Sequence, residues 1–226
     1  RVGEGSFVRD FSLKPFLNEI TLFYASSHAA QGDVTVLNKL SPIFVTLLAA
    51  VFMKEKLSSI QIPALVLSVL GAFIVFRPSF QSDPFPLIVA LLSAITSGIA
   101  YTFLGYFKGK VDGITVIMHF STFSVFGSLP FVIGNFVMPD LRQFLLLMLI
   151  SLFGSFGQVF ITYAYRLAPA SEISIYNYSG ILFSILLGAV VLGEPVKHTS
   201  ILGGALVAIA SIMVYIYGNS KKKEAK

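Results

Sequence analysis

Two asparagines in matching surroundings are the residues best suited to chemistry in this sequence. Asn38 lies about one helical turn before Pro42, and Asn177 lies about one turn before Gly180. A side-chain amide in hydrocarbon needs hydrogen-bonding partners, so each binds either a small polar molecule or a neighbouring helix. Proline and glycine weaken a helix, and helices interrupted at matching places are typical of transporter binding sites. The predicted substrate-binding residues are Asn38, Ser41, Pro42, Tyr176, Asn177, Tyr178, Ser179 and Gly180.

His119 and Lys39 are ionisable residues inside the same kind of apolar stretch. An ionisable side chain within a membrane is a functional candidate, and histidine titrates near neutrality, so His119 is a candidate for ion coupling. His119 also lies about five residues from a predicted helix start, within reach of the membrane interface. Lys39 either extends outward to that interface or attracts an anionic substrate.

Four acidic residues mark the ends of the two stretches that contain the asparagines. Asp33 and Glu172 open them, where a carboxylate stabilises the positive end of a helix. Glu55 and Glu194 close them among lysines, and we interpret both as surface charges or loop anchors. Gln158 is a further polar candidate in a later stretch.

Enzyme motifs are absent from the sequence. It has no His-Glu-x-x-His zinc pattern, no Gly-x-Ser-x-Gly elbow, no phosphate-binding glycine loop and no cysteine. An intramembrane hydrolase would need a nucleophile and a base, or two carboxylates, facing each other within the membrane. The acids here gather at the ends of the apolar stretches, so we expect no catalytic residue, no cofactor and no metal, and an intramembrane enzyme is the less favoured alternative.

The composition indicates the class of protein that must position these residues. Of 226 residues, 55% are hydrophobic and 12% are charged, and the mean hydropathy is +0.83. Soluble domains carry about 25% charged residues. The excess of Phe, Leu, Ile and Val excludes intrinsic disorder, and the lack of cysteine excludes a disulfide scaffold. The chain is therefore predicted to be an all-α polytopic membrane protein.

Apolar stretches long enough to cross a bilayer recur along the whole chain. A membrane helix needs about 20 mainly apolar residues. The stretch at 11–30 is an eighth, doubtful span, because Lys14, Pro15, Asn18 and Glu19 interrupt it. The seven clear stretches are 34–53, 58–76, 86–107, 114–138, 141–165, 172–192 and 199–217.

The basic residues are distributed unevenly between the two sides of these spans. The net charge is +5, but the basic residues flank apolar stretches, which indicates membrane topology and no nucleic-acid partner. With alternating spans, twelve of the 16 Lys and Arg residues lie on the side of the C-terminal lysines, and four lie on the other. Cytoplasmic loops carry the basic excess, so the C-terminus is predicted to be cytoplasmic.

A repeat with an offset of 139 residues relates the two halves. Asn38, Phe44 and Glu55 coincide with Asn177, Phe183 and Glu194, and conservative pairs open the two stretches. Five crossings separate the equivalent spans, so they must run in opposite directions. Inverted repeats of this kind are characteristic of secondary transporters.

These motifs resemble the EamA-type family of the drug/metabolite transporter superfamily. The resemblance lies in the run 33–45 followed by 54–57, and again in 167–172 followed by 192–195. It implies a ten-helix transporter fold of two inverted five-helix repeats, of which about eight helices are present. It also implies a central cavity and secondary active transport of small metabolites or drugs by alternating access, with export as the expected direction.

The repeat and the resemblance together divide the chain. Residues 1–80 are expected to form a first repeat that lacks its two initial helices, 84–218 a second repeat, and 219–226 a basic cytoplasmic tail. The expected partners are a small-molecule substrate and the bilayer of the plasma membrane, and homodimerisation is left open. A truncated integral membrane protein that does not transport is the main alternative.

Small residues such as Ala64, Ser68 and Ala72 predict close helix packing without chemistry.

Overall fold

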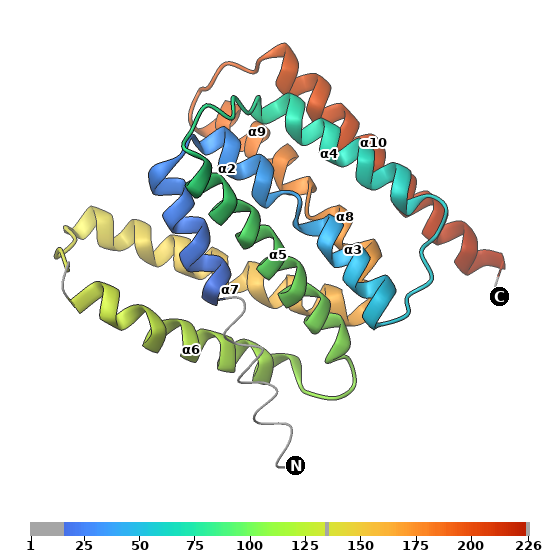
Figure 1. Cartoon of the computed structure of the whole chain (residues 1–226), viewed down its shortest axis with the longest axis horizontal. Helices are drawn as coiled ribbons and strands as arrows, with labels where there is room; N and C mark the ends of the chain where they lie inside the picture. Colours follow the sequence, from blue (N-terminus) through green and yellow to red (C-terminus); the bar gives the residue numbers. More distant parts are fainter. Residues whose placement is uncertain (1–15, 134–135, 225–226) are drawn as a thin grey trace.

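The computed structural model describes residues 16–133 and 136–224, and in that part the chain is helical without strands (Figure 1). This confirms the all-α prediction. A helix at residues 16–28 comes first. The helices that follow are α2 (Gln31–Asn38), α3 (Ser41–Phe52), α4 (Gln61–Phe76), α5 (Pro84–Tyr106), α6 (Gly113–Ile133), α7 (Leu141–Leu167), α8 (Ala170–Tyr176), α9 (Ser179–Val191) and α10 (His198–Glu224).

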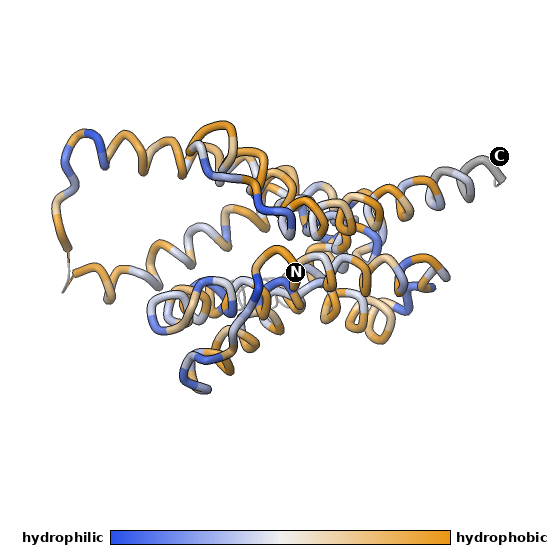
Figure 2. The backbone as a smooth tube through the Cα atoms, turned by 90° about the horizontal axis from the view of Figure 1, so that it is seen from above, coloured by the Kyte–Doolittle hydropathy of each residue, from blue (hydrophilic) through white to orange (hydrophobic). Residues whose placement is uncertain are grey.

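Six helical segments of the described part are long and apolar enough to cross a membrane. Figure 2 shows apolar residues along these helices, and hydrophilic residues mainly at their ends and turns. The helix α4 is shorter, with 16 residues. The six segments are 31–52, 84–106, 113–133, 141–167, 170–191 and 198–218, each within a few residues of a stretch expected from the sequence. The chain is therefore an integral multi-pass membrane protein.

Two of the spans are broken in the middle. The first passes from α2 to α3 through a turn at 39–40, and the second passes from α8 to α9 through a turn at 177–178. This confirms that both halves interrupt the same helix. The break lies directly before Ser41, so Pro42 occupies the first turn of α3, where a missing N–H costs no helical hydrogen bond.

The two broken spans lie side by side and run in opposite directions. Position 39 meets 178, Thr46 meets Ser174, and Glu55 meets Ala170. Residues that come later in the first span therefore contact residues that come earlier in the second. The ribbons in Figure 1 likewise run in opposite directions. The prediction that these two equivalent spans run in opposite directions is confirmed.

The ends of the broken spans repeat the same backbone geometry 139 residues apart. The amides of Glu55 and Glu194 bond to the carbonyls of Ala49 and Gly188 at 3.1 Å each. Lys54 has φ 54° and its equivalent Gly193 has φ 67°. The left-handed conformation is costly for lysine but easy for glycine. Lys54 adopts it because the turn at the end of the span requires a positive φ.

Close backbone contact joins α4 to α10, the next pair of equivalent helices. A Cβ on Gly71 would lie 2.7 Å from the carbonyl oxygen of Gly203, and one on Gly203 would lie 2.5 Å from that of Gly71. Ala64, Ser68 and Ala72 are buried on the same helix. The packing role expected of these small residues is confirmed.

The antiparallel arrangement makes a cross-linking prediction. The hydroxyl oxygens of Thr46 and Ser174 lie 3.5 Å apart, so the Thr46→Cys/Ser174→Cys pair should form a disulfide on mild oxidation. The protein has no native cysteine, so the product is read directly from its gel mobility. Thr46→Cys/Ser184→Cys is the matched control. Ser184 lies on the same span as Ser174, but on α9 instead of α8, so this pair should not react. Equal cross-linking of both pairs would contradict the inverted arrangement.

Candidate functional site

The break in the first span frees a carbonyl that the second span binds. The amide of Ile43 bonds to the carbonyl of Leu40, three residues back, at 2.9 Å. In a regular helix the Ile43 amide would bond to the carbonyl of Lys39, four residues back, so that carbonyl is left without a helical donor. The hydroxyl of Tyr178, which is fully buried, donates to this carbonyl at 2.6 Å.

The break in the second span also frees a carbonyl, and a side chain of the first span binds it. The amide of Ile181 bonds to the carbonyl of Tyr178, which leaves the carbonyl of Asn177 without its helical donor. The ammonium of Lys39 donates to that carbonyl at 3.4 Å. Lys39 therefore points toward the opposite repeat instead of extending to the interface. Lys39 and Tyr178 are equivalent positions of the repeat, and the side chain of each binds the carbonyl freed in the opposite span.

Asn38 ends α2 just before the first break, Asn177 lies in the second break, and both bind neighbouring helices through their amide nitrogens. Asn38 Nδ2 donates to Ser93 Oγ on α5 at 3.0 Å, and Asn177 Nδ2 donates to the Tyr165 hydroxyl on α7 at 3.0 Å. The ring of Tyr165 stacks on that of Tyr101 at 5.2 Å between centroids and an interplanar angle of 5°. The asparagines thus link the breaks to α5 and α7.

The other residues predicted for the site lie around these bonds. Ser41 and Pro42 are buried in the first turn of α3, and Tyr176 and Ser179 are half-buried on either side of the second break. Gly180 is exposed, and a Cβ there would lie 3.8 Å from the Lys39 ammonium. The structure therefore gathers the eight predicted residues at the two breaks.

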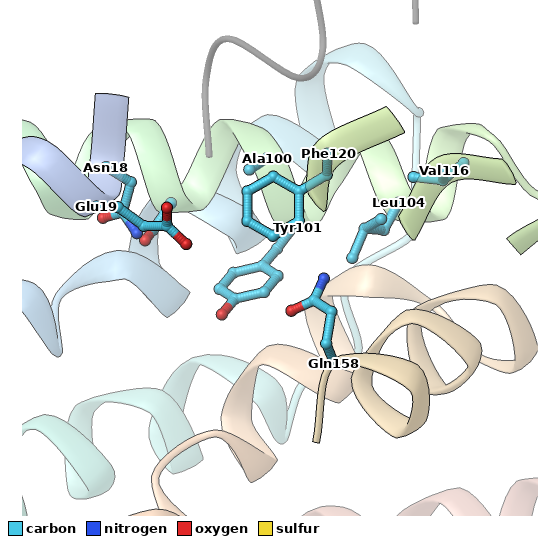
Figure 3. Close-up of a pocket in the computed structure, with 9 residues that line it drawn as sticks. Asn18, Glu19, Ala100, Tyr101, Leu104, Val116, Phe120 and Gln158 are labelled. Atoms are coloured by element: carbon cyan, nitrogen blue, oxygen red, sulfur yellow. The ribbon is translucent and has the colours of Figure 1, made fainter. Parts of the chain in front are cut away.

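A small polar pocket lies beyond Tyr101, as Figure 3 shows. Its volume is about 110 Å³. Glu19 and Asn18 reach it from the first helix, and Gln158 reaches it from α7. The nine lining residues are Asn18, Glu19, Ser97, Ala100, Tyr101, Leu104, Val116, Phe120 and Gln158.

The pocket offers hydrogen-bond acceptors to a ligand. Asn18 Oδ1 is buried and has no hydrogen-bond partner among the described residues. The half-buried Glu19 carboxylate lines the same pocket. A buried acceptor without a partner is costly, so a ligand that supplies N–H or O–H groups would stabilise this pocket.

Sequence reasoning identified only part of this pocket. Gln158 was expected to be a polar candidate, whereas Asn18 and Glu19 counted only as interruptions of a span. An acidic residue within an apolar stretch is itself a functional signal, and it could have indicated Glu19. No pattern in the sequence pointed to Tyr101. His119 is exposed on α6 and lies outside the pocket, next to Phe120, which lines it.

The acids at the ends of the broken spans act as anchors in the first half. The Glu55 carboxylate accepts the amides of Ala170 and Ser171 at 2.9 and 3.1 Å, and the Ser171 hydroxyl at 2.7 Å. The Asp33 carboxylate accepts the amide of Ser79 at 2.6 Å. These residues therefore fix loops and helix ends. The described residues contain no cluster of His, Asp or Glu suited to a metal ion.

Comparison with known proteins identifies the fold family. The model of the EamA-like transporter family matches residues 12–77 and 84–216. The chain belongs to this family. The EamA-like resemblance seen in the sequence is thereby confirmed, and membership indicates a transporter of small molecules rather than an enzyme.

Relatives of this EamA-like chain carry transporter names. The pseudopaline exporter CntI of Pseudomonas aeruginosa is 29% identical over 195 residues, which are 85% of this chain and 69% of that protein. The S-adenosylmethionine uptake transporter of Rickettsia prowazekii is 21% identical over 204 residues, 90% of this chain and 69% of that protein. Human solute carrier family 35 member G1 is 25% identical over 216 residues, 84% of this chain and 56% of that protein.

A solved structure shares the fold of the chain. It is a protein crystal structure with a TM-score of 0.77 and 15% identity, and the match covers 91% of this chain and 74% of the other. At this identity the similarity concerns the fold alone.

The bonds between the breaks make a stability prediction. Tyr178→Phe removes the hydroxyl that donates to the Lys39 carbonyl and should lower the free energy of unfolding by about 1–2 kcal/mol. Thermal unfolding of the purified protein measures the effect. Tyr176→Phe is the matched control, since no hydrogen bond of its hydroxyl is found among the described residues. Equal effects of the two substitutions would show that the bond is not a significant contribution.

Proposed function

We propose that this chain forms the substrate path of a secondary active transporter that works by alternating access. The observation that carries the proposal is the pair of broken helices, one from each half, which bind each other's freed carbonyls near a polar pocket. Irregular backbone within a membrane is stable only where it is enclosed by protein or lines a cavity. The halves 1–80 and 84–218 are proposed to be the two bodies that rock, and 219–226 the basic tail.

The proposed substrate is a small polar or amphipathic metabolite or drug. The pocket supplies acceptors from Asn18 and Glu19, an aromatic face from Tyr101 and an amide from Gln158. The eight residues at the breaks are proposed to complete the site when the pocket opens toward them. The stack of Tyr101 on Tyr165, and the bond from Asn177 to Tyr165, connect the two regions.

Glu19 and Lys39 lie at comparable depths. The first helix and α2 form a hairpin, with a turn at 29–30 (Figure 1). Glu19 precedes this turn by about ten residues and Lys39 follows it by about nine, which puts both roughly 15 Å from the turn. An acid and a base at one depth favour a substrate with both amine and anionic groups.

Export is the proposed direction, as the name of the CntI relative also suggests, whereas the Rickettsia relative is named for uptake. The proposed location is the plasma membrane. His119 is kept as a proposed coupling residue, acting from the helix that lines the pocket through Phe120.

Export should depend on Asn177 itself. Asn177→Leu removes the amide from the second break and should abolish the release of those metabolites that cells expressing the wild-type protein export. Mass spectrometry of the medium, with the amount of protein in the membrane measured in parallel, tests this. No wild-type-dependent release at all would argue against the export direction.

Tyr165→Phe is the control that separates binding from packing. It removes the hydroxyl that the Asn177 amide contacts at 3.0 Å, and leaves the amide in place. If Asn177 binds substrate, this variant should keep most of the export. If both variants lose export equally, the amide serves only to bind Tyr165, and the site lies elsewhere.

The proposed orientation makes a labelling prediction. A cysteine introduced by Lys223→Cys should resist a membrane-impermeant maleimide in intact cells and react after permeabilisation, because the basic side is cytoplasmic. Lys197→Cys, an exposed position just before α10, is the matched control and should react in intact cells. The opposite pattern would reverse the topology.

A further inference from the structure

An apolar groove lies between α3 and α5, apart from the polar pocket. Its volume is about 460 Å³, within the roughly 300–1,000 Å³ of cavities that hold small ligands. Leu48 and Phe52 line it from α3, and Ile99 and Phe103 line it from α5. The Thr102 hydroxyl in its wall donates to the carbonyl of Gly98 within the same helix at 2.8 Å, which leaves the wall largely apolar.

The groove reaches the ends of both helices, where lysines gather. The helices run parallel, and their C-terminal ends lie close together (Figure 1). A Cβ on Gly105 would lie 3.2 Å from the terminal methyl group of Met53. Lys54 follows the lining residue Met53 directly, and Lys108 follows the lining residue Tyr106 by two positions. The Lys110 ammonium lies 3.3 Å from the centroid of the Tyr106 ring. Lys54, Lys108 and Lys110 are all exposed.

Nearby carboxylates do not neutralise these lysines by direct pairing. Glu55 binds the amides of Ala170 and Ser171 at the start of α8. Asp112 accepts the amide of Ile114 at the start of α6, at 2.9 Å. Both acids are therefore engaged by helix ends, and the described residues at the mouth of the groove present a basic rim.

An apolar groove with a basic rim at the membrane surface matches an anionic amphiphile. We propose that the α3–α5 groove binds an anionic phospholipid, with an acyl chain along Leu48, Phe52, Ile99 and Phe103 and its phosphate beside Lys54, Lys108 and Lys110. Each lysine near an anionic headgroup contributes about 1 kcal/mol, roughly a fivefold gain in affinity. A zwitterionic lipid fits the apolar groove equally well but lacks the net charge, so the site selects by headgroup.

Native mass spectrometry of the purified protein tests this proposal with phosphatidylglycerol and phosphatidylethanolamine of the same acyl chains. The wild-type protein should prefer phosphatidylglycerol by about tenfold or more. The variant K54Q/K108Q/K110Q should lose that preference and still bind both lipids weakly. The matched control R77Q/R142Q/K197Q removes the same number of charges on the opposite side, and should keep the preference.

Two further arms separate the groove from the rim. Ile99→Trp fills the groove and should weaken both lipids alike, and soluble glycerol phosphate should not compete, because it lacks the acyl chain. The substituted lysines are exposed, so folding is retained, and thermal unfolding confirms it. No preference in the wild-type protein, or an unchanged preference in K54Q/K108Q/K110Q, would overturn the proposal. Competition by glycerol phosphate would show a free-phosphate site in place of a lipid site.

Discussion

A helix that breaks in hydrocarbon must find new partners for the backbone groups it frees, and this constraint governs the centre of the protein. An unsatisfied carbonyl at this depth costs several kcal/mol. Each half meets the need with a side chain of the other half, Tyr178 in one direction and Lys39 in the other. In both breaks the side chain that binds the freed carbonyl comes from the opposite half. The breaks are therefore stable only while the two spans lie antiparallel, and the bonds across the breaks hold the spans in that arrangement.

The repeat explains where the elements lie, and its exceptions mark where the two halves have different tasks. Glu55 fixes the start of α8, but its equivalent Glu194 is exposed. Asp33 fixes the loop at Ser79, and Glu172 lies beside Gly218, the repeat equivalent of Ser79. The acids therefore keep their places while only the first half uses them as strong anchors.

The sequence predicted the helical class, the spans and their inverted relation because each has a local signal. Apolar length marks a span, and Pro42 and Gly180 mark the breaks. The reciprocal bond of Tyr178 to Lys39 could not be predicted, because it joins positions 139 residues apart and depends on how two helices cross. The pocket at Tyr101 was missed for the same reason: four separate helices contribute to it, and Tyr101 alone resembles any other aromatic residue in a span.

The two halves also differ in what covers their broken spans. On α3 the Phe44 side chain packs against Gly98 of α5, so closely that a Cβ on that glycine would lie 2.5 Å from Phe44 Cβ. The equivalent Phe183 on α9 is 60% exposed. The Lys39 ammonium lies on this more open side, next to Gly180. Any segment or ligand that covers α9 there would lower the dielectric around the Lys39 ammonium and strengthen its bond to the Asn177 carbonyl, because charge-assisted bonds gain strength at low dielectric. A cover on that face would therefore strengthen one of the two bonds that join the broken spans.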